Sequence, residues 1–144
     1  MSFRRILIAI DGTAIAARAA GVGIELARSL GAEVALVHVV DAALGSAPET
    51  GISPASLLAD FEQEGRKLLA EFRQRAALQP APLEFLPIGK PGAEIVKAAK
   101  DWPADVIVMG SHGRGGLTRL LFGSVAETVM RHAPCPVLVV RAPA

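Results

Sequence analysis

The chain has 144 residues with a formal net charge of +1, and 51% of them are hydrophobic, which predicts a single globular domain over residues 1–144. Aromatic residues make up only 4% and no element concentrates Lys or Arg, so we expect no nucleic-acid binding. A single cysteine and the lack of an apolar run near the ~20 residues of a membrane helix indicate a cytoplasmic protein that does not span a membrane.

Segments typical of strands and of helices alternate along the chain. The first segment, residues 3–10, contains the continuous apolar run Ile6–Ile10, as in a strand whose sheet is covered on both faces. An alanine-rich helix follows, which Gly31 is placed to end. Gly21 and Gly23 inside this helix indicate close packing on the sheet. In chain order we expect strand 3–10, helix 14–30, strand 33–40, helix 54–78, strand 81–88, helix 93–101, strand 105–109, helix 124–132 and strand 136–141.

Turn-forming residues set the boundaries in the middle of the chain. Residues 41–53 contain Gly, Ser, Pro and Thr without periodicity, which predicts a loop. Ser53 is suited to cap the helix that follows, and Pro54 is suited to begin it. Pro82 and Pro87 predict that the third strand is irregular or lies at an edge of the sheet.

This alternation predicts an α/β fold, a doubly wound three-layer sandwich around a five-stranded parallel sheet. We expect the strand order 3-2-1-4-5. The first and fourth strands then flank the topological switch point, where ligands bind at the carboxyl ends of the strands. Asp11 and Gly110 end these two strands, so the topology places the segment after Gly110 at this crevice.

A glycine-rich segment follows the fourth strand. Four glycines fall within seven residues, namely Gly110, Gly113, Gly115 and Gly116. Nine residues separate Gly113 from Gly123, and Ser124 follows directly. Ser124 with Glu127 three residues later forms a capping-box pattern, so we expect Ser124 to cap the last helix. Backbone amides of such a loop and of a helix start are suited to bind phosphate.

Two common phosphate loops do not fit this spacing. A Walker A loop counted from Gly110 needs Lys after Gly115, where the chain has Gly116. A dinucleotide fingerprint counted from Gly113 needs Gly or Ala where the chain has Thr118. On these residues alone, a tight turn that binds no ligand stays open as the alternative.

The stretch VIVMGSHGRGGLTRLLFGSVAETV, with its Gly-x2-Gly-x9-Gly-Ser spacing, resembles the nucleotide-binding signature of the universal stress protein family. The opening ILIAIDGT and the ending HAPCPVLVVR are similar to the same family. The resemblance covers the whole chain and implies the adenine nucleotide alpha hydrolase-like fold. It also implies an ATP-binding regulator of the stress response, with or without Mg²⁺ and with little or no turnover.

The resemblance also assigns the candidate nucleotide-binding residues. Ile10, Asp11 and Val39, at the ends of the first two strands, would form the adenine side. The ribose and phosphate side would comprise Gly110, Ser111, His112, Gly113, Arg114, Gly115, Gly116, Gly123, Ser124, Val125 and Ala126. Arg114 is the cation within the loop and could neutralise phosphate charge. Asp11 could instead cap its own turn or assist Mg²⁺, and Ser124 could be a helix cap alone.

No metal site is predicted from the histidines. His38, His112 and His132 lack the spacing of metal ligands. His38 is expected to pack or to face a loop. Cys135, between two prolines, is expected to be a small buried residue.

Other functions stay open at this point. The same loop could serve a weak ATPase or an autophosphorylating kinase, with Ser111, Thr118 or Ser124 as the acceptor. An ATP pyrophosphatase or a flavoprotein of related fold is a further class, although a pyrophosphatase would need Ser-Gly-Gly after the first strand, where this chain has Asp-Gly-Thr. A pure interaction module with an empty pocket is the remaining alternative.

The last strand is short and strongly apolar, and it runs from Pro136 to Arg141. At the edge of the sheet, such a strand favours pairing with another subunit. The resemblance likewise implies a homodimer through this strand. The alternative is that the C-terminal tail covers the edge.

Overall fold

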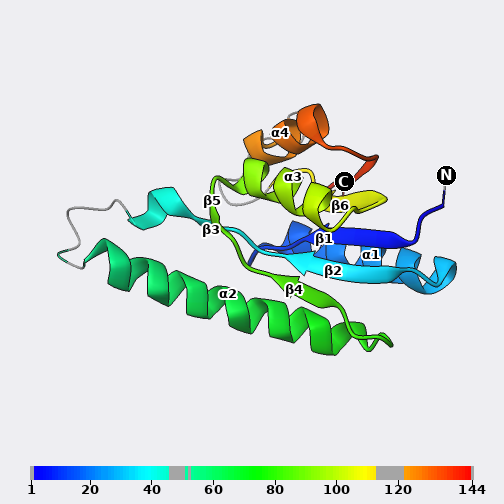
Figure 1. Ribbon diagram of the computed structural model, residues 1–144, viewed down its shortest axis with the longest axis horizontal. Coiled ribbons are helices and arrows are strands. Elements are labelled where there is room, and N and C mark those ends of the chain that lie inside the picture. The colour runs from blue at the N-terminus through cyan, green and yellow to red at the C-terminus, as the bar shows by residue number, and fades with distance from the viewer. Residues whose placement is uncertain (1, 46–50, 52, 113–121, 144) are drawn as a thin grey trace.

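A parallel β-sheet lies between two pairs of helices (Figure 1). The computed structural model describes residues 2–45, 51, 53–112 and 122–143. Its strands are β1 (Arg5–Ala9), β2 (Glu33–Val37), β3 (Val40–Asp41), β4 (Leu83–Phe85), β5 (Ile88–Gly89), β6 (Val106–Gly110) and β7 (Val137–Val140). Its helices are α1 (Ala14–Leu30), the 3-10 turn η1 (Ala42–Gly45), α2 (Pro54–Ala76), α3 (Pro91–Asp101) and α4 (Ser124–His132).

The five-stranded sheet has the order β4-β2-β1-β6-β7, and every pair in it is parallel. This is the predicted 3-2-1-4-5 pattern. In the register of the sheet, Leu7 of β1 lies between Ala35 of β2 and Ile107 of β6. The chain leaves β1 and β6 for opposite sides of the sheet, so the topological switch point lies where predicted, at the carboxyl ends of these two strands.

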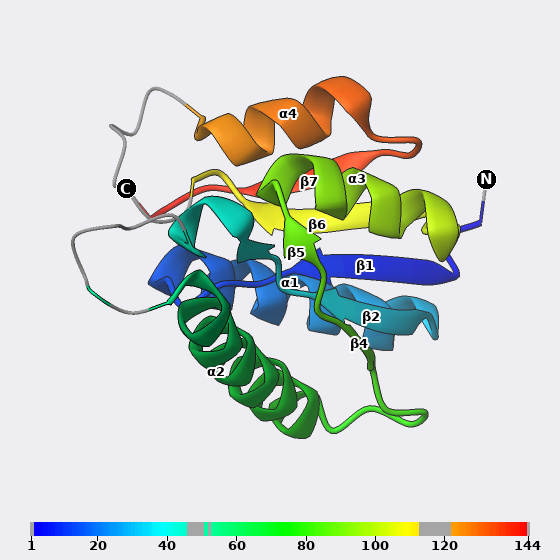
Figure 2. The ribbon, with the colours of Figure 1, turned by 60° about the vertical axis from the view of Figure 1, so that its left-hand side comes forward.

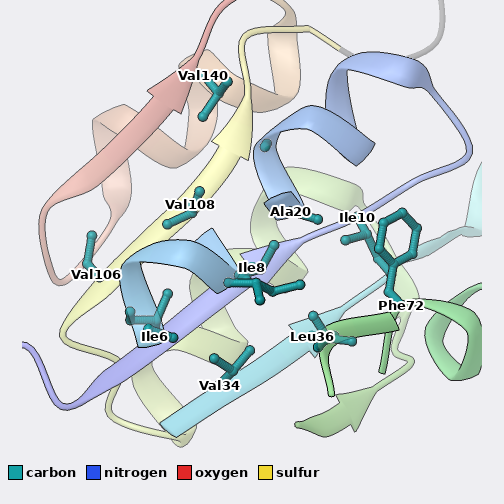
Figure 3. Packing of buried hydrophobic residues seen from close by; sticks show 14 of the residues in the cluster. Ile6, Ile8, Ile10, Ala20, Val34, Leu36, Phe72, Val106, Val108 and Val140 are labelled. Atoms are coloured by element: carbon teal, nitrogen blue, oxygen red, sulfur yellow. The ribbon is translucent and has the colours of Figure 1, made fainter. Parts of the chain in front are cut away.

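The side chains of β1 alternate between the two layers of helices. Ile6 and Ile8 belong to the same cluster as Phe72 and pack under α1 and α2 (Figure 3). Leu7 points to the opposite face and belongs to the cluster of Ile95 on α3. All three β1 side chains are fully buried. The continuous apolar run therefore comes from burial on both faces, because neither side of the strand meets water.

The second and third predicted strands are each broken into two. The backbone amide of His38 donates to Phe85 (3.0 Å) and that of Val40 donates to Pro87 (2.9 Å). Pro87 has no amide hydrogen, so the regular ladder cannot continue through it. The pairing resumes as the separate two-stranded sheet of β3 and β5. Figure 2 shows these short strands beside η1, beyond the ends of β2 and β4.

The helices begin and end close to the predicted residues. Thr13 caps α1 by accepting a hydrogen bond from the amide of Ala16 (3.2 Å), and Gly31 ends it with φ 64°. Ser53 caps α2 as predicted. Helix α3 begins at Pro91, two residues earlier than expected, because proline is favourable in a first turn. Within the part of the chain described here, no helix combines the length and the apolar character that a membrane crossing requires.

Candidate functional site

A cleft of about 690 Å³ lies at the carboxyl ends of β1 and β6. Its lining includes the predicted residues Ile10, Asp11, Val39, Gly110, His112, Gly123, Ser124, Val125 and Ala126. Ser111 is buried next to them and does not line the cleft. Gly113, Arg114, Gly115 and Gly116 lie outside the described residues, as does Thr118. The structure thus brings together the two strand ends and the helix start that the sequence analysis assigned to one site.

The start of α4 corrects the predicted capping box. Gly123, not Ser124, is the N-cap residue, since the amide of Glu127 donates to the Gly123 carbonyl (3.0 Å). Ser124 is therefore the first residue inside the helix, and among the described residues no side chain caps the first turn. The amides of a first helical turn have no partners within the helix. Those of Ser124, Val125 and Ala126 are thus uncapped, and all three residues line the cleft.

Close contact between the two ends of the glycine-rich segment explains this shift. The Gly123 amide donates to the carbonyl of Ser111 (2.8 Å), and the Ser111 amide donates to Val140 of β7 (2.9 Å). A Cβ on residue 123 would lie 3.1 Å from both Cα and Cβ of His112. Glycine is therefore the residue that best permits this close contact with His112. It takes the N-cap position, and Ser124 follows as the first residue of the helix.

Ser111 and His112 have different surroundings. Ser111 is 5% exposed, and its Oγ lies 3.0 Å from Nδ1 of His112. Ser111 thus anchors the start of the segment through its backbone and pairs its buried hydroxyl with the neighbouring imidazole. His112 itself lines the cleft.

Asp11 caps its own turn, as one of the two sequence-based alternatives stated. Its Oδ1 accepts hydrogen bonds from the Thr13 amide (2.8 Å) and from the Thr13 hydroxyl (2.5 Å). These bonds hold the turn between β1 and α1, which places Asp11 in the lining of the cleft.

Among the described residues, the backbone amide and carbonyl of Val39 have no hydrogen-bond partner, whereas those of Ile10 are both hydrogen-bonded. The Ile10 amide donates to Val37 (2.9 Å), and the Ile10 carbonyl is bonded to the ring of His38 (2.9 Å). His38 and Val40 bond towards β4 and β5, so Val39 between them faces the side of β1. Because β1 ends at Ala9, the described residues offer no backbone partner to the amide or the carbonyl of Val39.

One wall of the cleft was missed in the sequence analysis. Phe61, Gly65 and Leu68 of α2 line it, together with His38 and Leu44. The spacing of the three α2 residues puts them on one helical face, which is a recognisable signal. The sequence analysis assigned this face no role at the site, because nothing local shows that a cleft lies opposite it.

The charge of the described lining is acidic. Asp11, Asp41 and Glu64 are among the lining residues, and none of the described lining residues is Lys or Arg. In the described ranges, no group of three or more His, Cys, Asp or Glu side chains is arranged to hold a metal ion. The positive end of the α4 dipole is therefore a described feature of the cleft that attracts an anion.

The family model and the curated relatives that match this chain all point to the same family. The model of the universal stress protein family matches residues 2–141. The chain is 38% identical to universal stress protein MJ0531 of Methanocaldococcus jannaschii, over 98% of this chain and 84% of that protein. It is 33% identical to universal stress protein YxiE of Bacillus subtilis, over 96% of this chain and 99% of that protein.

Solved structures agree with this family. The structure of hypothetical protein MJ0577 superposes with a TM-score of 0.87 at 28% identity, covering 100% of this chain and 99% of that one. A universal stress protein in complex with cAMP gives a TM-score of 0.72 at 22% identity, covering 99% of this chain and 100% of that one. The latter similarity shows the shared fold.

Proposed function

Because the chain belongs to the universal stress protein family, we propose that it binds ATP in the cleft and acts as a regulator of the stress response with little or no turnover. The observation that carries this proposal is the uncapped first turn of α4, whose residues line the cleft. A protein of the same fold was solved in complex with cAMP, so this fold can hold an adenine nucleotide.

The phosphate groups would bind at the start of α4. Three amides without helical partners and the positive end of the helix dipole both favour an anion there. No Lys or Arg is among the described lining residues. We therefore expect the phosphate groups to be attracted mainly by the amides of Ser124 and Val125. In this proposal, Gly113, Arg114, Gly115 and Gly116 wrap the phosphates, with or without Mg²⁺.

The adenine base would bind at Val39. The amide and the carbonyl of this residue face the same side, past the end of β1. Adenine presents a ring nitrogen that accepts a hydrogen bond next to an amino group that donates one. The donor and the acceptor of Val39 match this pair. The apolar side chains of Phe61 and Leu68 in the opposite wall suit the faces of a base.

A substitution at the helix start tests the phosphate site. Ser124→Asp places a negative charge at the first turn, which stabilises the helix by about 0.3–1 kcal/mol through its dipole. The same charge repels phosphate, so we expect the Kd for ATP to rise about tenfold or more. Isothermal titration calorimetry gives the Kd, and urea unfolding gives the stability.

Ser124→Asn is the matched control, because it has nearly the same shape as Asp but no charge. We expect it to keep ATP affinity within about threefold of the native protein, since the amides bind the phosphate. Equal ATP binding by the Asp and Asn variants would contradict a phosphate site at this helix start.

The identity and fate of the nucleotide need separate measurements. Mass spectrometry of small molecules released from the purified protein distinguishes ATP, ADP, AMP and cAMP. Incubation with γ-labelled ATP and Mg²⁺ tests the alternative of a weak ATPase or autophosphorylating kinase. Stoichiometric phosphate release or labelled protein would favour the enzyme over the regulatory binder.

We also propose a homodimer that pairs through β7. This strand is at the edge of the five-stranded sheet and is hydrogen-bonded to β6 on one side. Leu138, in its middle, is 39% exposed. An apolar edge strand of this kind favours addition of a second chain.

A further inference from the structure

The ring of His38 is held in one tautomer. Its Nδ1 lies 2.9 Å from the backbone carbonyl oxygen of Ile10. A carbonyl oxygen can only accept a hydrogen bond, so Nδ1 must carry the proton. In the neutral imidazole, the other ring nitrogen, Nε2, is then an acceptor.

This acceptor is open to the cleft. His38 lines the cleft at the break between β2 and β3. In the part of the chain that the structure describes, Nε2 has no hydrogen-bond partner, and no side-chain nitrogen or oxygen is both buried and unpaired. Nε2 is therefore accessible, and it lies 3.5 Å from the position of a Cβ on Gly65, which lines the cleft together with His38.

Helix α2 keeps the ring in this position. A Cβ on Gly65 would lie 2.8 Å from Cδ2 of His38 and 2.7 Å from Cδ1 of Leu86. Glycine inside a helix costs about 1 kcal/mol relative to alanine. The space that this glycine leaves is filled by the imidazole, so the ring is confined between α2 and the carbonyl of Ile10.

We propose that His38 determines specificity for the nucleoside half of the ligand, by accepting a hydrogen bond at Nε2 from a donor on the base or the ribose. This inference rests on the proposed nucleotide binding and adds a contact to it. The donor is either the exocyclic amino group of adenine or the ribose 2′-hydroxyl. Val39, the next residue in the chain, also lines the cleft.

Two substitutions separate the roles of the ring nitrogens. In His38→Asn the side-chain amide still donates to Ile10 but leaves nothing at the position of Nε2. In His38→Phe the ring volume is kept and both hydrogen bonds are lost. The Kd values for ATP, ITP and 2′-deoxyATP are measured by calorimetry for the native protein and both variants, with urea unfolding as the check on folding.

We expect the native protein to prefer ATP over the analogue that lacks the donor by about 3–10-fold, as one neutral hydrogen bond predicts. Inosine lacks the amino group, and the deoxynucleotide lacks the 2′-hydroxyl, so the weaker analogue identifies the donor. The preference should fall by threefold or more in His38→Asn. An unchanged preference for ATP over both analogues in His38→Asn would overturn the role of His38 while leaving nucleotide binding intact.

A spectroscopic measurement does not depend on affinity. Long-range ¹H–¹⁵N spectra should show His38 protonated at Nδ1 when neutral, and the Nε2 resonance should shift when ATP is added. Protonation at Nε2 instead would overturn the inference. If the native protein binds no nucleotide at all, the proposed function itself is wrong and this inference falls with it.

Discussion

At the scale of single residues, the choice of glycine at position 123 determines how the site is presented. Glycine at an N-cap is only slightly worse than the preferred polar residues, yet it supplies no side chain to bond the first-turn amides. The contact with His112 leaves little room for any side chain there. The close contact that requires glycine at position 123 therefore leaves the amides of Ser124, Val125 and Ala126 available to a ligand.

Cys135 permits a test away from the cleft. Burial raises the pKa of its thiol, and the negative charge of Asp105 raises it further, while a hydrogen bond from the Ile107 backbone opposes them. The thiolate is the reactive form, so we expect slower alkylation by iodoacetamide in the folded protein than in urea at the same pH. The pH at which the rate is half-maximal should be higher for the folded chain.

The sign of the accompanying stability change follows from proton linkage. On raising the pH, the unfolded chain loses the Cys135 proton first, so the folded chain holds more protons in that range. The stability that this thiol contributes is present at neutral pH and declines as the pH rises past the ordinary thiol pKa. Identical alkylation profiles in native and unfolded protein would contradict both statements.

At the scale of elements, substitutions of two glycines in α1 are expected to change the stability in opposite directions. A Cβ on Gly23 would lie 2.6 Å from Cδ1 of Ile8 and 3.5 Å from Cβ of Val108. A Cβ on Gly21 would meet nothing within 4 Å. Close packing on the sheet therefore explains Gly23, as the sequence analysis expected, but not Gly21.

We expect Gly21→Ala to raise the free energy of unfolding by about 0.5–1 kcal/mol, because alanine is the better helix former. Gly23→Ala should lower it by about 1–3 kcal/mol, because the extra methyl group strains a filled core. Urea unfolding of the two variants in parallel measures both values. Similar stabilities would show that α1 does not pack on β1 as described.

The elements that were predicted well are those determined by local pattern. The apolar run of β1, the cap at Ser53 and the stop at Gly31 follow from side-chain type and neighbouring residues alone. Their order also predicts the crevice, because parallel strands joined by right-handed crossovers leave few topologies. The strand-end half of the site was predictable for the same reason.

The rest depends on contacts between segments far apart in sequence. Ser124 matches a capping box locally, yet the hydrogen bond from Gly123 to Ser111 moves the cap by one residue. The break at His38 depends on Pro87 in a neighbouring strand. The α2 wall depends on how this helix packs beside η1 and β3, and no local pattern in α2 contains that information.

At the scale of the whole molecule, the two edges of the sheet differ in how much apolar strand they offer. Both edge strands follow a proline and pair with their inner neighbour along their length, but β4 has three residues with the charged Glu84 in its middle, whereas β7 has four apolar residues. Short edge strands that carry a charge resist further pairing, and longer apolar ones favour it. The sheet is therefore expected to extend through β7 and not through β4.

Charges placed on each edge test this expectation. Leu138→Lys puts a positive charge in the proposed β7 contact, and the control Leu83→Lys puts one on β4, where the native leucine is 49% exposed. Light scattering coupled to size exclusion should give twice the chain mass for the native protein and for Leu83→Lys. Leu138→Lys should give the mass of one chain, because burying an unpaired ammonium group in an apolar interface is unfavourable. A native protein of single-chain mass, or dissociation by Leu83→Lys alone, would exclude pairing through β7.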